Sequence, residues 1–190
     1  MPVKMNSRPT PGSNIVTPGI NLCGLRMLDA AIDRYEPDLL ISICGEAYER
    51  KAADPIIDLY GPLTYRMDFE DVYGMPSSLN GQSKAPHLDM FRGLFAFIDE
   101  NFPDAPPARI LAQCSIGKSR SAAVGLLAGA YIAQRSTPVE DQPMAARLLV
   151  SRLLKEHRSM EPNRTALGMG CCLMGDMGAD LMKQVMEQVG

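Results

Sequence analysis

The sequence has no tryptophan, only two histidines and few aromatic residues, so sites built from these side chains are hard to assemble. His87 and His157 have no partners at a spacing that suggests a metal site, and both are expected on helix surfaces. We therefore expect no metal and no cofactor. The 13 methionines are interpreted as adaptable packing residues of the core.

The chain also lacks a strong charge of either sign. Its net charge of −3 argues against nucleic acid or an anionic membrane surface as the general partner. No apolar run approaches the length of a membrane span, and residues 1–10 lack the apolar core of a secretory signal. The five cysteines are an odd number at irregular spacings, which does not fit a disulfide framework. A reducing cytoplasm is therefore the expected location, with the thiols free to react.

The pattern of apolar segments predicts one α/β domain over residues 14–190, preceded by a flexible, polar arm at residues 1–13. Strands separated by helices favour a central, mainly parallel sheet of four or five strands with helices on both faces. A loop rich in Pro, Gly and Ser is expected at 73–85. Strands are expected at 14–17, 38–43, 63–69 and 109–113, and helices at 20–35, 86–101, 118–134, 145–157, from Glu161 onward and at 176–189.

The most informative segment is residues 114–121, which read CSIGKSRS between a predicted buried strand and a predicted helix. In such a connection, backbone N–H groups and the positive end of the helix dipole converge on one point and form a cradle for an anion. Cys114 would add a nucleophile and Arg120 a bidentate phosphate clamp, which is the equipment for cysteine-based hydrolysis of phosphate esters. The expected cradle residues are Ser115, Ile116, Gly117, Lys118 and Ser119, with Gly117 allowing the tight turn.

A second cysteine has an arginine six residues later, but its surroundings are wrong for a phosphate. Between Cys44 and Arg50 lie Glu46 and Glu49, whose charges would repel the anion. This segment also lacks the small hydroxylic residues that follow Cys114. The sequence therefore favours Cys114 as the nucleophile.

The block from Ile110 to Ile132 resembles the signature region of the cysteine-dependent protein tyrosine phosphatases, and more closely their dual-specificity-like bacterial members. Residues 64–72 resemble the strand and loop that carry the general acid of that family. Residues 157–164, with the run Glu-Pro-Asn at 161–163, resemble a segment that several bacterial members have after the signature. The resemblance covers roughly residues 38–175.

The resemblance implies hydrolysis of a phosphate monoester without metal, through a phosphocysteine on Cys114. It also implies that Ser121 hydrogen-bonds the sulfur and that Asp71 is the general acid, with Asp68 and then Glu70 as alternatives. The implied substrate is a phosphorylated protein or a small phosphomonoester.

One residue departs from the family pattern, because Gln113 stands where a histidine usually precedes the cysteine. This leaves a phosphate-binding pseudophosphatase as an alternative. A thiol redox enzyme or arsenate reductase is a further alternative, which would need Cys171 or Cys172 close to Cys114 as a resolving thiol.

Overall fold

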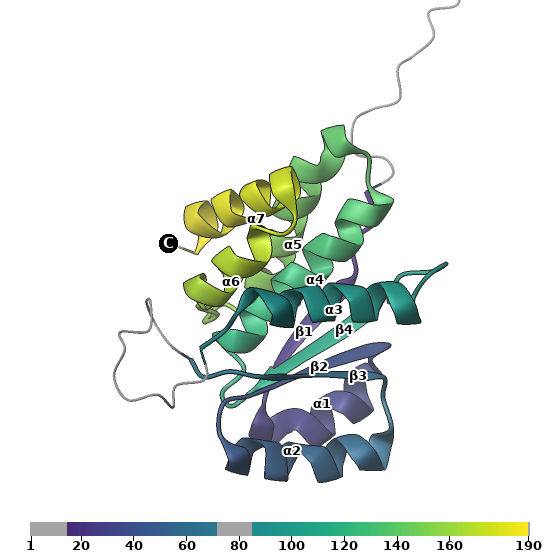
Figure 1. The fold of residues 1–190 in the computed structure, drawn as a ribbon, viewed down its shortest axis with the longest axis vertical. Coiled ribbons are helices and arrows are strands. Elements are labelled where there is room, and N and C mark those ends of the chain that lie inside the picture. The colour runs from purple at the N-terminus through teal and green to yellow at the C-terminus, as the bar shows by residue number, and fades with distance from the viewer. Residues whose placement is uncertain (1–14, 72–84, 190) are drawn as a thin grey trace, which may run out of the picture.

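The computed structural model describes residues 15–71 and 85–189, which form one α/β domain around a four-stranded sheet in which all strands are parallel (Figure 1). The predicted fold class is thus confirmed, with four strands. The arm expected at 1–13 lies outside the described residues. The strand order is β1-β4-β2-β3, with β1 at Gly19–Gly24, β2 at Leu39–Cys44, β3 at Thr64–Asp68 and β4 at Arg109–Cys114.

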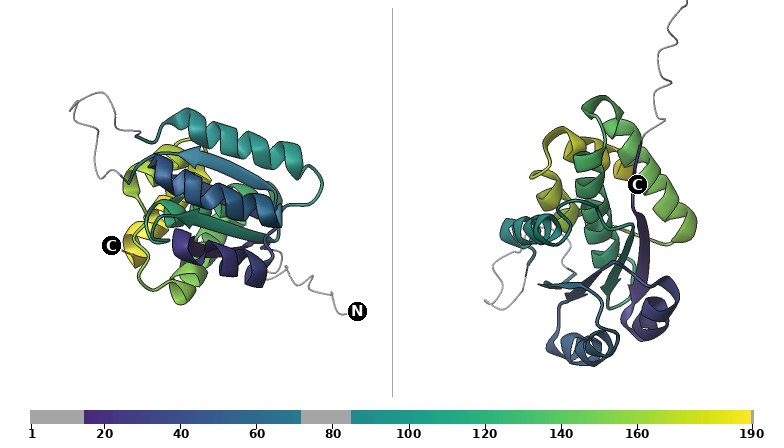
Figure 2. Two further views of the ribbon diagram at one scale, coloured as in Figure 1. Left: turned by 90° about the horizontal axis from the view of Figure 1, so that it is seen from below. Right: turned by 90° about the vertical axis from the view of Figure 1, so that its right-hand side faces the viewer.

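Helices cover both faces of the sheet, as Figures 1 and 2 show. The helix α4 is the central element, because 13 of its 17 residues are buried between the sheet and the outer helices. One face carries α1 (Leu28–Tyr35) and α2 (Ala47–Tyr60), and the other carries α3 (Leu88–Asn101), α4 (Arg120–Ser136), α5 (Gln142–Glu156), α6 (Arg164–Cys171) and α7 (Gly175–Gln188).

The predicted N-terminal elements are displaced in the structure. No strand is found over the described residues of 14–17, and the first strand, β1, occupies the start of the segment predicted as a helix at 20–35. A 3-10 turn at Leu25–Met27 then leads into α1. Leu22 has a spacing from Leu25 and Leu28 that fits a helix, but its neighbour Cys23 packs on the opposite face of the sheet, as alternation in a strand requires.

The helix α2 was not predicted at all. Its sequence contains Pro55, which lacks the N–H that an α-helix uses, so the segment does not look helical. Local interactions nevertheless define its start, because Glu46 and Glu49 form a capping box at the N-terminus. The helix ends at Gly61, whose left-handed backbone suits glycine.

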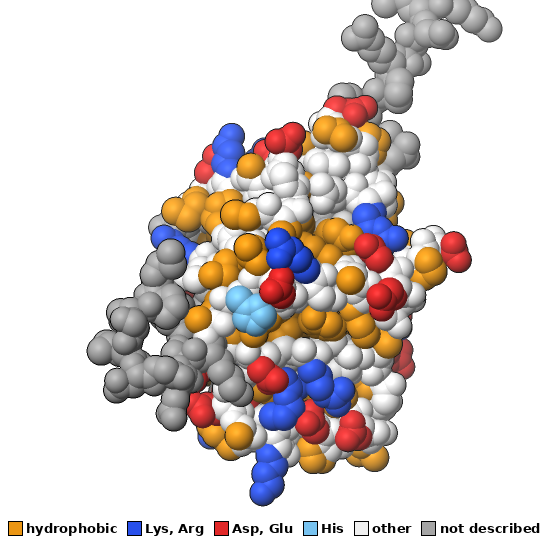
Figure 3. All heavy atoms as spheres, viewed as in Figure 1, with side chains coloured by type: hydrophobic (Ala, Val, Ile, Leu, Met, Phe, Trp, Pro, Cys, Tyr) orange, Lys and Arg blue, Asp and Glu red, His pale blue; other side chains and the backbone are white. Residues whose placement is uncertain are grey.

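The parallel arrangement brings the carboxyl ends of β2, β3 and β4 to one edge of the sheet, where the loop after Cys114 lies. Charged side chains of both signs are interspersed on the face of the molecule seen in Figure 3. Among the helices of the described ranges, none has the length and apolar character needed to cross a membrane.

Candidate active site

A cavity of about 340 Å³ lies at this edge of the sheet and brings together residues that are far apart in the chain. They come from the loop after β4, from α2, from the segment after β3 and from the segment before α6. Cys114, Arg120 and Asp71, which the sequence singled out, all line this one cavity. Among the described residues, the lining consists of Glu49, Asp71, Cys114, Ser115, Ile116, Lys118, Ser119, Arg120 and Glu161.

The sulfur of Cys114 is buried and lies inside a turn of the backbone. The N–H of Gly117 donates a hydrogen bond to Sγ at 3.2 Å, and the thiol donates to Ser121 Oγ at 3.3 Å. Gly117 has φ of +84°, and a Cβ there would lie 2.5 Å from the backbone of Cys23 and Gly24 on β1. Only glycine therefore fits this turn, which agrees with the tight turn expected from the sequence.

Arg120 is buried and held in place by an ion pair with Glu49. Its two terminal nitrogens donate to the two carboxylate oxygens at 3.2 and 3.1 Å, and Nη1 also donates to the carbonyl of Phe69 at 3.0 Å. Burial opposes the charge on both side chains, but the hydrogen bonds and the opposite charge outweigh it. The pKa of Arg120 is therefore raised and the pKa of Glu49 is lowered.

The role of Glu49 was missed in the sequence, where it counted only as a charge that excludes phosphate from the segment after Cys44. Its carboxylate also accepts the N–H of Gly45 at 2.6 Å, so the acid is held from both sides. The local signal for Glu49 is the capping box of α2, which predicts where the helix begins. Nothing in that local signal indicates a contact with Arg120, 71 residues away.

Asp71 is fixed over the loop by two donors to the same oxygen. Ser119 Oγ donates to Oδ1 at 2.8 Å, and Asn163 Nδ2 donates to Oδ1 at 2.7 Å. Asn163 also caps α6, since its Oδ1 accepts the N–H of Ala166 at 2.9 Å. The same segment supports the loop through its backbone, because the N–H groups of Glu161 and Asn163 donate to the carbonyls of the loop at 3.1 and 3.2 Å.

The two alternative acids lie elsewhere. Asp68 is exposed and pairs with Arg50 at 2.7 Å, and neither it nor Glu70 lines the cavity. Of the three carboxylates considered from the sequence, Asp71 alone lies beside Cys114. The loop expected at 73–85 lies outside the described residues, apart from residue 85.

Gln113 lies next to Cys114 in β4 but its side chain is on the opposite face of the sheet. Its Oε1 accepts a hydrogen bond from Ser42 Oγ at 2.9 Å. Its Nε2 is buried and, among the described residues, has no hydrogen-bond partner. The side chain of Gln113 is thus hydrogen-bonded to β2 and not to the loop that follows Cys114.

The remaining residues considered from the sequence are not brought into this cavity. His87 precedes α3, while His157 is half-buried and accepts a hydrogen bond from the N–H of Leu22 at 3.2 Å. The expectation that His157 is a surface residue is therefore wrong. Cys171 is buried in the core, and burial raises its pKa to about 12, whereas Cys172 is exposed. Within the described ranges, no group of three His, Cys, Asp or Glu is arranged to hold a metal ion.

No protein family model matches the chain, and no curated protein matches it. Three solved structures of protein tyrosine phosphatases are similar to it at low identity. Tk-PTP in the active form has a TM-score of 0.41 and 17% identity, covering 75% of this chain and 99% of its own. A mutant form of Tk-PTP has a TM-score of 0.47 and 13% identity, covering 89% of this chain and 93% of its own. PTPMT1 has a TM-score of 0.44 and 14% identity, covering 90% of this chain and 94% of its own.

Proposed function

We propose that the protein hydrolyses phosphate monoesters through a phosphocysteine intermediate, as a relative of the dual-specificity-like tyrosine phosphatases. The observation that carries this proposal is the convergence of Cys114, Arg120 and Asp71 on one cavity. A thiol, a buried guanidinium and a carboxylate are the three groups that such a reaction needs. The proposed substrates are phosphorylated proteins and small phosphomonoesters.

In the first step, the Cys114 thiolate attacks phosphorus while the bond between phosphorus and the ester oxygen breaks. Asp71 gives its proton to the leaving oxygen. The backbone N–H groups of residues 115–119 and the guanidinium of Arg120 stabilise the charge on the equatorial oxygens of the phosphoryl group. Arg120 needs no reorganisation for this, because Glu49 already fixes it.

In the second step, the Asp71 carboxylate takes a proton from water, whose oxygen attacks phosphorus. The bond between phosphorus and sulfur breaks, inorganic phosphate leaves, and the thiolate of Cys114 is regenerated. The Ser121 hydroxyl, which lies 3.3 Å from the sulfur, stabilises this thiolate by donating a hydrogen bond to it. The cycle closes without a cofactor.

The deciding experiment is the hydrolysis of an aryl phosphate by the wild type and by Cys114→Ser, in the presence of a chelator, between pH 5 and 8. We expect turnover that persists in chelator and is lost in the variant, with phosphate trapped on Cys114 after rapid acid quench. The Ser121→Ala variant should accumulate more of the trapped species, because its second step is slower. Turnover that is unchanged in Cys114→Ser would refute the mechanism.

A phosphate-binding pseudophosphatase is the second candidate, and the observation that favours it is the position of Gln113. The side chain that replaces the family histidine turns toward Ser42 and adds no hydrogen bond to the loop. In this case vanadate would still bind to the wild type, but neither turnover nor a phosphocysteine would be detected. The redox alternative has less support, since neither Cys171 nor Cys172 lines the cavity of Cys114.

A further inference from the structure

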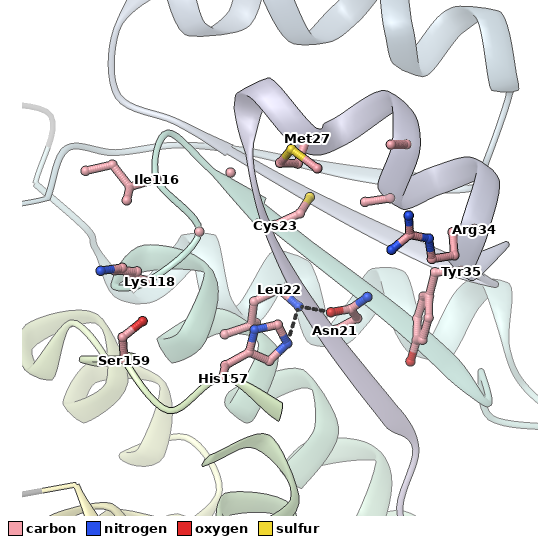
Figure 4. A pocket seen from close by; sticks show the side chains of 14 residues that line it. Asn21, Leu22, Cys23, Met27, Arg34, Tyr35, Ile116, Lys118, His157 and Ser159 are labelled. Carbon is pink, nitrogen blue, oxygen red and sulfur yellow. Dashed lines mark hydrogen bonds between the residues drawn. The ribbon is translucent and has the colours of Figure 1, made fainter. Parts of the chain in front are cut away.

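A second cavity, of about 380 Å³, lies beside the first and shares part of its wall (Figure 4). It is bounded by the exposed edge of β1, by α1 and by the segment that follows α5. Ile116 and Lys118 line both cavities, so the loop that follows Cys114 separates them. The volume falls in the range of cavities that bind small organic molecules.

Among the described residues that line this second cavity, the charged groups are all cationic. None of its 14 lining residues is an Asp or Glu, although the chain has 22 acidic residues. Arg34 and Lys118 extend from opposite ends of it in Figure 4. Among the described residues neither has an ion-pair partner within 4.0 Å, whereas several other arginines of the chain are paired. Glu156 influences His157 electrostatically but does not line the cavity.

Two polar side chains beside β1, those of Asn21 and His157, have their acceptor atoms occupied. The N–H of Leu22 donates to Nε2 of His157 at 3.2 Å and to Oδ1 of Asn21 at 2.9 Å, so both of these acceptors are occupied. Burial lowers the pKa of His157, and the accepted hydrogen bond places the proton of the neutral ring on Nδ1. The Nδ1–H of His157 and the amide group of Asn21 have no partner among the described residues, which leaves both as donors.

The rest of the wall is apolar and accessible. Met27 is 57% exposed and Ile116 is 74% exposed, although both are large hydrophobic side chains. Ala30 and Ala31 of α1 leave room beside them. Removal of such apolar surface from water by a ligand favours binding.

We propose that this second cavity binds a small organic anion. Its apolar body would lie on Met27, Ala31 and Ile116, and its negative groups would face Arg34 and Lys118, with hydrogen bonds from Asn21 and His157. Because Ile116 and Lys118 also line the cavity of Cys114, the bound anion alters the affinity of that cavity for phosphate. By thermodynamic linkage, phosphate alters the affinity for the anion by the same factor.

The test is a calorimetric titration of the full chain with naphthalene-1,5-disulfonate, with and without saturating orthovanadate to occupy the cavity of Cys114. We expect saturable binding of one molecule per chain in the presence of vanadate. The affinity should fall roughly tenfold in Arg34→Ala, the loss of one charged contact. Arg26→Ala is the matched control, since Arg26 is also exposed, lies just before α1 and does not line the cavity.

A second variant tests the location independently of charge. Ala30→Trp places a bulky group at an exposed position of the wall, so it should abolish binding and leave the melting temperature unchanged. The proposal is overturned if no saturable binding occurs, if vanadate abolishes it, or if Arg26→Ala weakens it as much as Arg34→Ala. It is likewise overturned if Ala30→Trp folds and binds like the wild type.

The coupling to the loop rests on the proposed function, whereas the binding does not. In the wild type, the disulfonate should change the KM for an aryl phosphate by severalfold, and in Arg34→Ala the same concentration should change it less. Vanadate affinity, measured with and without the disulfonate, should shift by a comparable factor even if the protein has no turnover. Binding of the disulfonate with neither shift would refute the coupling.

Discussion

Arg120 shows, at the scale of a single residue, how partners inside the protein stabilise a buried charge. A guanidinium that leaves water loses hydration free energy, which must be recovered from partners inside the protein. Glu49 supplies a carboxylate that matches the guanidinium fork, and the carbonyl of Phe69 accepts a third hydrogen bond. The same contacts orient the group toward the cavity.

We expect Glu49→Ala to destabilise the protein by about 3–5 kcal/mol, because it leaves the buried charge of Arg120 unpaired. Glu49→Gln should cost less, since its amide oxygen still accepts a hydrogen bond. Urea unfolding at pH 7 measures both. Asp58→Ala is the control, because it removes a partner of the exposed Arg66 and should cause little change. Equal losses for Glu49→Ala and Asp58→Ala would contradict this account.

The same ion pair predicts a pH dependence of stability. Since the pKa of Glu49 is lowered from its ordinary value of 4.5, the unfolded chain takes up the proton first as the pH falls. The stabilisation from the Glu49 charge is therefore complete above pH 4.5 and is lost as the pH falls through the lower pKa of the folded state. The difference in unfolding free energy between the wild type and Glu49→Gln should shrink correspondingly. If this difference in unfolding free energy stayed constant down to pH 3, the charge of Glu49 would not contribute to stability as expected.

Asn163 contributes both to the catalytic cavity and to the start of α6. Its amide donates to Asp71, and its oxygen caps α6. We expect Asn163→Ala to cost about 1 kcal/mol from the lost cap, and to lower kcat/KM by roughly 10²-fold because Asp71 is no longer held in place. Ser119→Ala removes the other donor to Asp71 without affecting the cap. It should lower activity with a smaller loss of stability, whereas unchanged activity in both variants would contradict the assignment of Asp71.

At the scale of the elements, segments whose character is set by burial were predictable. The strands β2 and β4 are buried on both faces and read as continuous apolar runs, and α4 shows the apolar composition of a central helix. The strand β1 was not predictable, since its apolar residues also fit a helical spacing with those that follow.

In the candidate site, too, some residues could be predicted from the sequence and others could not. The loop after Cys114 is continuous in sequence, so its residue types reveal its chemistry. The support from Glu49 and Asn163 depends on contacts between segments that are distant in the chain. The local sequence around Glu49 and Asn163 does not identify Arg120 and Asp71 as their partners, so only the fold shows these contacts.

The helix α2 contains a proline whose cost to stability can be measured. Pro55 lies on its exposed side, where it removes one backbone hydrogen bond and gains no packing in return. We expect Pro55→Ala to stabilise the protein by about 1–3 kcal/mol. Part of this gain is offset, because the unfolded chain has more conformational entropy without the proline. The urea midpoint should rise while kcat/KM stays unchanged. A lower midpoint would mean that the proline is needed for the shape of the helix.

At the scale of the whole molecule, the two faces of the sheet differ in how much core they hold. The larger hydrophobic cluster joins the sheet to α3 through α7, whereas the cluster under α1 and α2 contains eight buried residues within the described part of the chain. Cooperative units with less buried apolar surface open at lower free energy. The side with α1 and α2 is therefore expected to open first.

Because Glu49 lies on α2, this opening would release Arg120 from its partner before the core unfolds. In increasing urea we therefore expect the hydrolysis of an aryl phosphate to be lost at a lower concentration than the far-UV circular dichroism of the protein. Hydrogen exchange should show peptides of α2 exchanging before those of β4 and α4. Pro55→Ala, which strengthens α2, should move the loss of activity toward the global transition. Activity and circular dichroism that decline together, with α2 as protected as β4, would show that both faces unfold as one unit.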